Sequence, residues 1–187
     1  MIINPLKLIL ITIGFIFSGC ALPSARPFFL TPESVSAKKL IVPVFRQSDL
    51  NMCGIAALQM IESFFKVPIQ TQYHENLVAG VNASNGTSGA ALKDALINSG
   101  YNAVIFPGDL SNGVAGLYHH IDSGHPVIVM IGAETKRHYL VAFGYDPENQ
   151  KIYFNDPLKG AVAYSSESFL KFWQSANNFS LLAFPKP

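Results

Sequence analysis

Apolar and polar positions follow two different periods along the chain. In the first part, apolar residues recur at spacings of three and four, which is typical of helices with one buried face. This spacing predicts helices over residues 53–65, 72–79, 88–99 and 111–122, with a short strand over 102–106. Later, short apolar runs between turn residues predict strands over 126–131, 138–145, 151–155, 160–164 and 179–184. One last helix begins at Ser165 or Ser166.

Local signals refine several of these elements. Residues 40–45 are apolar with an internal proline, which favours an edge strand or an extended arm. Pro68 ends the first helix, and Thr87 or Ser88 can cap the third. The side chains expected on inner faces are Leu92, Leu96 and Ile97 in the third helix and Phe169, Phe172 and Trp173 in the last.

Helices that precede a meander of strands indicate an α+β fold. The connections between the strands are too short for parallel crossovers, so the sheet is expected to be antiparallel. The chain has 187 residues, of which 49% are hydrophobic and 13% charged, enough to bury one sizeable core. We expect one globular domain over residues 40–187.

The first twenty residues form a separate pattern. Lys7 precedes an apolar run from Leu8 to Phe17, which is shorter than the roughly 20 residues of a membrane-spanning helix. This order is typical of an export signal, and its ending, FSGC, resembles the lipobox of bacterial lipoproteins. The resemblance implies a signal peptide over 1–19, a lipid on Cys20 and a tether over 20–39. An uncleaved amphipathic anchor and an ordinary signal with an incidental cysteine remain open.

The charge pattern argues against nucleic acid as a partner. The formal net charge is +1, and the basic residues are scattered, so no stripe exists to hold phosphates.

The expected location is the bacterial cell envelope, facing the periplasm. Ala21 after the lipid cysteine resembles outer-membrane sorting, so we expect anchoring there through Cys20.

Cys53 is the main candidate for chemistry. If Cys20 carries lipid, Cys53 has no disulfide partner within the chain, although export favours disulfides. It stands where a polar loop gives way to a helical pattern, and the start of a helix favours thiolate over thiol. The alternative is a small apolar residue at a helix start. An unpaired thiol in an oxidising compartment favours reactivity.

A thiolate nucleophile needs a histidine, and that histidine needs an acceptor to orient it. His138 opens an apolar strand, where a polar ring is otherwise out of place. Asp156 ends the next strand, which puts it beside the start of the first in an antiparallel pair. Asp156 could instead only begin a turn before proline, and Asn155 is an alternative orienting residue. We interpret the remaining histidines as surface or structural; they are His74, His119, His120 and His125.

The last three of those histidines have no acidic or thiolate companions at ligand spacing, so no metal site is expected. No cofactor is expected either.

Four segments together resemble a known family. They are QSDLNMCGIAAL, GHPVIVMI, RHYLVAFGYD and NDPLKG, and the resemblance covers about residues 42–173. It is to the peptidase C39 family of bacteriocin-processing, or double-glycine, peptidases, which have a papain-like fold. The resemblance implies that Cys53 is the nucleophile, His138 the base and acid, and Asp156 the orienting residue. It also implies that the Gln47 amide and the Cys53 N–H form an oxyanion hole.

The chain departs from the family in two respects. Met52 stands where many relatives carry an acidic residue. Exporter-fused relatives also carry membrane spans and a P-loop, whereas this sequence has no second apolar span and no G-x-x-x-x-G-K-[ST] pattern. We therefore expect a stand-alone, membrane-tethered member.

The sequence predicts a lipid-anchored cysteine peptidase that forms an acyl-enzyme with a peptide or protein substrate of the envelope. Relatives cut after a pair of small residues, usually Gly-Gly, and a secretion or export system is a candidate partner. Two alternatives remain open. One is a thiol amidase or acyltransferase that acts on cell-wall peptides, and the other is a non-catalytic binding or assembly protein on the same fold.

Overall fold

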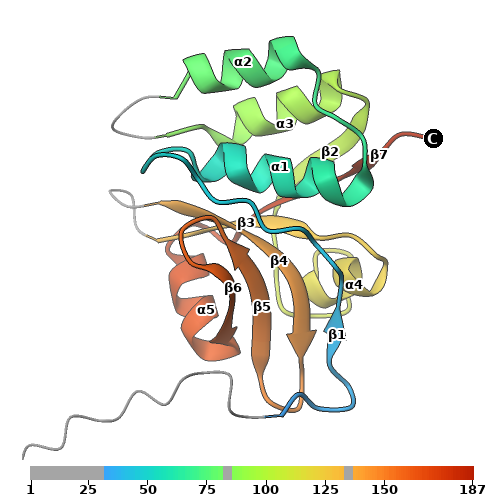
Figure 1. Ribbon diagram of the computed structural model, residues 1–187. Helices are drawn as coiled ribbons and strands as arrows, with labels where there is room; N and C mark the ends of the chain where they lie inside the picture. Colours follow the sequence, from blue (N-terminus) through green and yellow to red (C-terminus); the bar gives the residue numbers. More distant parts are fainter. Residues whose placement is uncertain (1–31, 82–85, 133–136) are drawn as a thin grey trace, which may run out of the picture. The chain divides into compact units, whose positions relative to one another are not determined.

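An antiparallel sheet separates two groups of helices (Figure 1). The computed structural model describes residues 32–81, 86–132 and 137–187, all within the unit Pro32–Pro187. The expected signal peptide, Cys20 and residues 20–31 of the tether lie outside these residues. None of the helices in the described part is long and apolar enough to cross a membrane.

The elements follow the predicted order. The helices are α1 (Cys53–Phe65), α2 (Thr71–Ala79), α3 (Gly89–Asn98), α4 (Leu117–Asp122) and α5 (Ser166–Gln174). The strands are β1 (Lys38–Lys39), β2 (Tyr101–Pro107), β3 (Val127–Ile131), β4 (His138–Asp146), β5 (Lys151–Asp156), β6 (Gly160–Ser165) and β7 (Phe179–Pro185). Their order in the sheet is β2-β7-β3-β4-β5-β6, with β1 added on β4, and all these strand pairs are antiparallel. The predicted α+β fold is confirmed.

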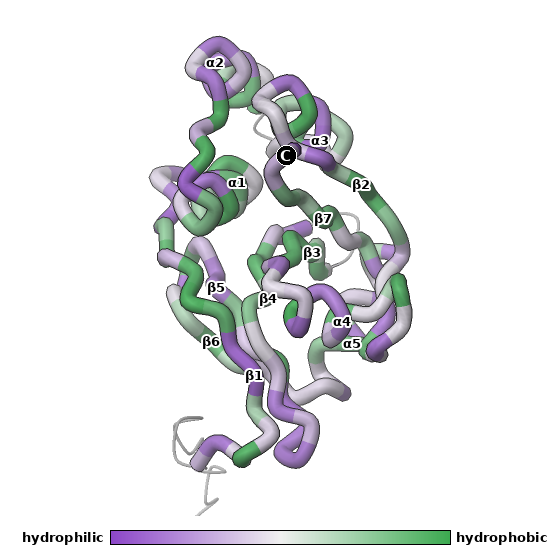
Figure 2. The backbone as a smooth tube through the Cα atoms, turned by 90° about the vertical axis from the view of Figure 1, so that its right-hand side faces the viewer, coloured by the Kyte–Doolittle hydropathy of each residue, from purple (hydrophilic) through white to green (hydrophobic). Residues whose placement is uncertain are grey.

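The two faces of the sheet build two cores, because side chains alternate along each strand. Ile128 and Met130 of β3 belong to the core shared with α1, α2 and α3. Val127 and Val129 belong to the core shared with α4 and α5. Figure 2 shows hydrophobic stretches of α1, β3 and β7 in the middle of the molecule. The sheet is therefore covered on both faces, and α1 packs against β4.

The predicted helix over 111–122 is wrong in its first half, since α4 begins only at Leu117. Residues 111–116 form turns, and the Leu117 N–H donates to the Asp109 carbonyl. A Cβ on Gly116 would lie 1.9 Å from the Ser111 carbonyl oxygen. The backbone thus folds back on itself at a point where only glycine fits, so the helix cannot extend to residues before Leu117.

Two side chains predicted on inner faces lie outside. Leu92, Leu96, Phe169 and Trp173 are buried as expected. Ile97, however, is 37% exposed and Phe172 is 51% exposed. The buried residues of each helix, Leu92 with Leu96 and Phe169 with Trp173, are four apart and therefore share one face. Ile97 and Phe172 are direct neighbours of these residues in the sequence, so they point to the side of that face.

The chain before α1 is an extended arm along β4. Lys38 and Lys39 pair with Tyr145 and Gly144, and the Leu40 N–H donates to the Phe143 carbonyl at 2.8 Å. Residues 40–45 then continue without a regular strand, which matches the expected extended arm. Their path leads directly to the loop before Cys53.

At the other end of this arm, a buried carboxylate holds the chain. The Ser34 N–H and Oγ donate to Asp146 at 3.0 and 2.6 Å. The Asn149 N–H and side-chain amide donate to the same carboxylate at 3.1 and 2.8 Å. The arm is therefore fixed at the end of β4 that lies away from His138.

Candidate active site

Cys53 is the first residue of α1, and the backbone N–H groups of this helix start have no side-chain cap. Met52 occupies the N-cap position without a capping hydrogen bond, and the first turn contains no acidic residue. The first N–H groups of a helix lack partners within the helix and carry partial positive charge. The buried, free thiol of Cys53 lies at this positive end.

His138 and Asp156 form a short hydrogen-bonded pair beside this thiol. The His138 Nε2 and the Asp156 Oδ1 are 2.7 Å apart. The same Oδ1 accepts the Leu158 N–H at 2.8 Å, which fixes the carboxylate at the end of β5. Since Nε2 faces Asp156, the Nδ1 atom of His138 remains for the Cys53 thiol, with which the ring forms a hydrogen bond. Asp156 and His138 lie together because β4 and β5 pair antiparallel, as expected.

The surroundings of Cys53 favour its thiolate. Burial alone would raise the pKa of the thiol, but hydrogen bonds from the His138 side chain and from the Tyr139 N–H outweigh burial. The charge of His138 and the Gly54 N–H add to this effect. The net result is a pKa of Cys53 below its ordinary value.

His138 has the opposite shift. Burial alone would lower the pKa of its imidazole, but the hydrogen bonds and charges of Asp156 and Cys53 raise this pKa to about 9. Burial would raise the pKa of Asp156, whereas the hydrogen bonds from His138 and from the Leu158 N–H lower it. These shifts favour a thiolate, an imidazolium and a carboxylate in a row near neutral pH.

Gln47 stands at the end of the extended arm. Its backbone N–H donates to the Pro157 carbonyl at 3.1 Å, beside the turn that follows Asp156. Its side-chain Nε2 donates to the Asp49 carbonyl at 2.5 Å, and its Oε1 is buried with no partner among the described residues. A primary amide has two N–H groups, so one remains for another acceptor. Its role in an oxyanion hole stays a prediction.

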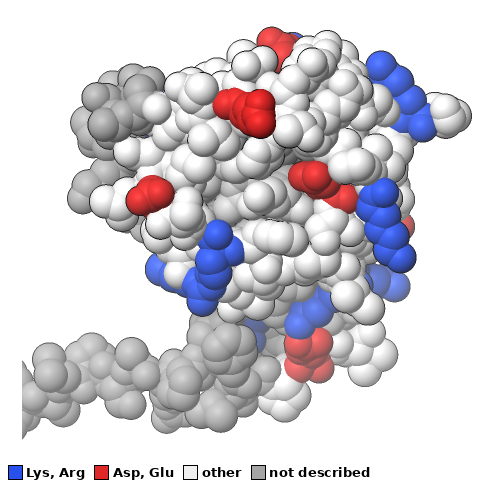
Figure 3. Space-filling model, turned by 45° about the horizontal axis from the view of Figure 1, so that its top comes forward, with Lys and Arg blue, Asp and Glu red and all other residues white. Residues whose placement is uncertain are grey.

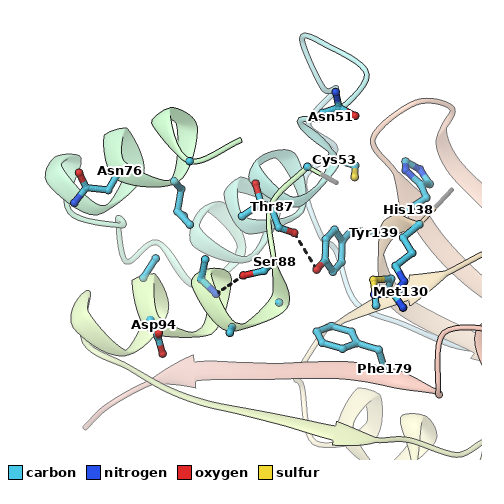
Figure 4. A pocket seen from close by; sticks show the side chains of 18 of the residues that line it. Asn51, Cys53, Asn76, Thr87, Ser88, Asp94, Met130, His138, Tyr139 and Phe179 are labelled. Atoms are coloured by element: carbon cyan, nitrogen blue, oxygen red, sulfur yellow. Dashed lines mark hydrogen bonds between the residues drawn. The ribbon is translucent and has the colours of Figure 1, made fainter. Parts of the chain in front are cut away.

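A cavity of about 1450 Å³ opens over Cys53 and His138. Figure 4 shows these two side chains at one side of it, with Asn76 of α2 and Asp94 of α3 at the other. The segment 86–91 lines the wall with small residues: Gly86, Thr87, Ser88, Gly89, Ala90 and Ala91. A main chain without long side chains lets an extended peptide approach the backbone closely.

Two residues near the site have roles that the sequence did not predict. Tyr139 supplies the backbone N–H to Cys53, and its hydroxyl donates to the Thr87 carbonyl in the cavity wall at 3.2 Å. Asn155 does not orient His138, because its amide donates to the Val42 carbonyl at 2.8 Å. It therefore binds the arm to β5. The sequence signal was only their position beside His138 and Asp156.

The other histidines lie away from Cys53. His120 is buried, its Nε2 has no partner among the described residues, and burial lowers its pKa. The His125 ring stacks on Phe184 at 5.1 Å. No cluster of three or more potential metal ligands occurs in the described parts of the chain. Figure 3 shows basic and acidic side chains interspersed on the face that it presents, without a continuous basic stripe.

Comparison with known protein families agrees with the fold. A model of the Peptidase_C39 like family matches residues 39–181. The chain belongs to this family. The match covers most of the chain, so the expected family is confirmed. The matched range includes Cys53, His138 and Asp156. The roles of the individual side chains remain predictions.

Solved structures share the fold of this C39-like chain. A double-glycine motif protease from an AMS/PCAT transporter, crystallised with the leader peptide, has a TM-score of 0.60 and 21% identity, over 83% of this chain and 100% of that one. The peptidase domain of Streptococcus ComA, a bi-functional ABC transporter, has a TM-score of 0.62 and 20% identity, over 76% and 98%. A C39-like peptidase from Bacillus anthracis has a TM-score of 0.60 and 18% identity, over 80% and 98%.

Curated relatives of the C39-like chain include uncharacterized proteins of Mycobacterium bovis and Mycobacterium tuberculosis. Each is 29% identical over 123 residues, which covers 52% of this chain and 53% of the relative. The chain thus spans about half the length of the curated relatives it matches.

Proposed function

We propose that the chain is a cysteine peptidase that cleaves a peptide or protein substrate in the bacterial cell envelope. One observation carries the proposal: a buried thiol at an uncapped helix start is hydrogen-bonded to a histidine that is itself 2.7 Å from a carboxylate. This is the arrangement of a nucleophile, a base and an orienting group. The cavity of about 1450 Å³ gives a peptide access to it.

In the first half of the reaction, the Cys53 thiolate attacks the carbonyl carbon of the scissile peptide bond. The negative charge that forms on the carbonyl oxygen is stabilised by the Cys53 N–H and the Gln47 amide. The imidazolium of His138 then gives its proton to the leaving nitrogen, the C–N bond breaks, and an amine departs. A thioester between Cys53 and the acyl fragment remains.

In the second half, His138 is neutral and accepts a proton from water as the water oxygen attacks the thioester carbonyl. The C–S bond breaks, the acyl fragment leaves as a carboxylic acid, and Cys53 is released as the thiolate beside the imidazolium. Asp156 keeps the Nε2–H of His138 in place through both halves and does not itself exchange a proton.

The proposed substrate is an extended peptide with two small residues before the scissile bond, of the Gly-Gly or Gly-Ala type. Similarity to a double-glycine motif protease that was crystallised with a leader peptide supports this substrate class. The small residues of the cavity wall leave the enzyme main chain open to strand-like hydrogen bonding. A lipid on Cys20 would hold the enzyme at the outer membrane, close to an export system that delivers the substrate.

A quenched-fluorescence peptide library that varies the two residues before the scissile bond tests the proposal. Wild type and Cys53→Ala are compared on each peptide, and mass spectrometry locates the cut. We expect cleavage that depends on Cys53. Bulky residues at either position should prevent this cleavage by steric exclusion. If cleavage depends on Cys53 but not on the size of these two residues, the chain is a peptidase and the Gly-Gly type specificity is wrong.

A panel of muropeptides, assayed in parallel, tests the amidase alternative. Cys53-dependent release from muropeptides without any peptide cleavage would replace the peptidase by a cell-wall amidase. If wild type and Cys53→Ala behave alike on both panels, the site does not catalyse hydrolysis, and a binding role on the same fold is favoured.

A further inference from the structure

Two leucines are exposed where the cavity opens beside the candidate nucleophile. Leu50 is 84% exposed and Leu158 is 52% exposed, and both line the cavity that contains Cys53. They come from different loops: Leu50 precedes α1, and Leu158 lies in the turn between β5 and β6. A single exposed apolar side chain is ordinary, but two from separate loops at one cavity mouth suggest an apolar ligand group.

Leu158 lies on the His138 side of Cys53, and Leu50 lies in the loop directly before Cys53. The Leu158 N–H donates to the Asp156 Oδ1 at 2.8 Å, and this same oxygen is bonded to His138. Figure 4 shows Asn51, the neighbour of Leu50, above Cys53 and His138 to its right, whereas Asn76 and Asp94 lie far to the left. A peptide that fills the cavity therefore crosses Cys53 between α2 and α3 on one side and the two leucines on the other.

The position of the general acid decides which part of the substrate reaches the leucines. His138 has to come within hydrogen-bond distance of the leaving nitrogen to protonate it. The chain that continues from this nitrogen must then leave the site on the His138 side. We infer that Leu50 and Leu158 form a subsite for an apolar side chain on the first residue after the scissile bond. This inference rests on the proposed function. It adds a specificity for the leaving fragment to the one proposed for the acyl fragment.

The subsite makes a specific prediction about the steps of the reaction. The leaving fragment occupies the site during formation of the thioester and is absent during its hydrolysis. An added amine can return to the same place and attack the thioester carbon through its nitrogen. Neutral His138 accepts a proton from this nitrogen, the C–S bond breaks, and a new amide forms as Cys53 is released as the thiolate. Amines with an apolar side chain should therefore compete with water for the acyl-enzyme better than polar ones.

Two peptides that differ only in the residue after the scissile bond, Leu or Ser, test the subsite. Wild type should cleave the Leu peptide with a kcat/KM about 10-fold higher, since a partly buried leucine is favoured by about that factor. Leu50→Ser and Leu158→Ser should each reduce this ratio, and the double variant should bring it close to 1. Val114→Ser is the matched control, because Val114 is 87% exposed and does not line the cavity.

A second measurement separates the subsite from general damage to the active site. An ester with the acyl part of the cleaved peptide forms the acyl-enzyme, and leucinamide and serinamide compete with water for it. The ratio of the two amide products does not depend on how fast the acyl-enzyme forms. Wild type and Val114→Ser should favour leucinamide, and the double variant should lose this preference.

The outcomes distinguish this inference from the proposed function. If wild type cleaves both peptides equally well, the leucine subsite is excluded and the peptidase stands. If the double variant keeps the wild-type ratio of amide products, the subsite lies elsewhere. If wild type cleaves neither peptide and Cys53 forms no acyl-enzyme with the ester, both proposals are wrong.

Discussion

At the scale of single residues, the chemistry of Cys53 and His138 depends on a shared hydrogen bond. Each group shifts the pKa of the other, so the thiolate–imidazolium pair exists between a lowered pKa of Cys53 and a raised pKa of His138 of about 9. The sequence indicated the helix start, the strand and the turn that bring them together. It gave no direct sign of the Tyr139 N–H, because a backbone contact carries no residue preference.

The first prediction concerns the rate at which Cys53 reacts with an alkylating reagent. A lowered pKa keeps the Cys53 thiolate populated below about pH 8.5, the ordinary value for cysteine. The alkylation rate measured against pH should therefore have its midpoint below this value, and His138→Ala should move the midpoint upward. A single transition near 8.5 that His138→Ala leaves in place would show a passive thiol.

The second prediction concerns Asp156, which supports the protonated form of His138. Activity that needs the imidazolium should fall as the pH rises through about 9, where His138 loses its proton. Asp156→Asn removes the negative charge that raises this pKa and leaves only a neutral hydrogen-bond acceptor, so the alkaline limb of kcat/KM should move to lower pH. Activity should fall less than in Cys53→Ala, which lacks the nucleophile. An unchanged alkaline limb would show that Asp156 does not set the protonation of His138.

At the scale of elements, local patterns predicted most boundaries, and the failures have local causes. The predicted limits of α1 agree with the structure, because Cys53 follows a polar loop and Pro68 follows its end. The helix over 111–122 failed because Gly116 permits a close approach of the backbone to Ser111, which apolar spacing does not reveal. The pairing of β2 with β7 could not be predicted either, since these strands are far apart in the sequence and their contact depends on the whole sheet.

The arm before α1 gives a prediction about stability. The buried Asp146 accepts four hydrogen bonds, two from Ser34 and two from Asn149. Asp146→Ala should lower the free energy of unfolding by about 1–3 kcal/mol because the hydrogen bonds to this buried, charged acceptor are lost. Glu148→Ala is the control, since Glu148 accepts only an exposed hydrogen bond from Ser36.

The pH dependence of the same variant has a defined sign. Burial would raise the pKa of Asp146, but the hydrogen bonds from Ser34 and Asn149 hold it far below its usual range. A lowered pKa contributes stability that is present above the ordinary value of about 3.9 and is lost as the pH falls below it. Urea unfolding at pH 7 and pH 3 should show a larger loss in Asp146→Ala at pH 7. An equal loss at both pH values would contradict a role for the ionised carboxylate.

At the scale of the whole molecule, the arm before α1 is held at one end of β4, and the active site lies at the other end. Ser34 is held at the end of β4, and His138 stands at its start. A strand of nine residues spans about 27 Å at roughly 3.3 Å per residue. The active site therefore lies at the opposite end of β4 from Ser34.

The lipid anchor is tested on the full chain in bacterial cells. If Cys20 carries lipid, the protein should partition into the detergent phase, and Cys20→Ala should move it to the aqueous phase. Cys53→Ala is the matched control, because it changes the other cysteine and should leave partitioning as it is. Detergent-phase partitioning of the Cys20→Ala variant would show that the lipobox interpretation is wrong.

The central claim is that Cys53 forms a covalent acyl-enzyme with a peptide substrate, and mass spectrometry of the trapped intermediate tests it most directly. Wild type is mixed with an excess of an activated ester of a peptide that ends in Gly-Gly, quenched in acid and digested. The account predicts a mass increase equal to the acyl fragment on the segment that contains Cys53, and a greatly reduced increase in His138→Ala. No adduct in wild type, or one on another residue that persists in Cys53→Ala, would contradict it.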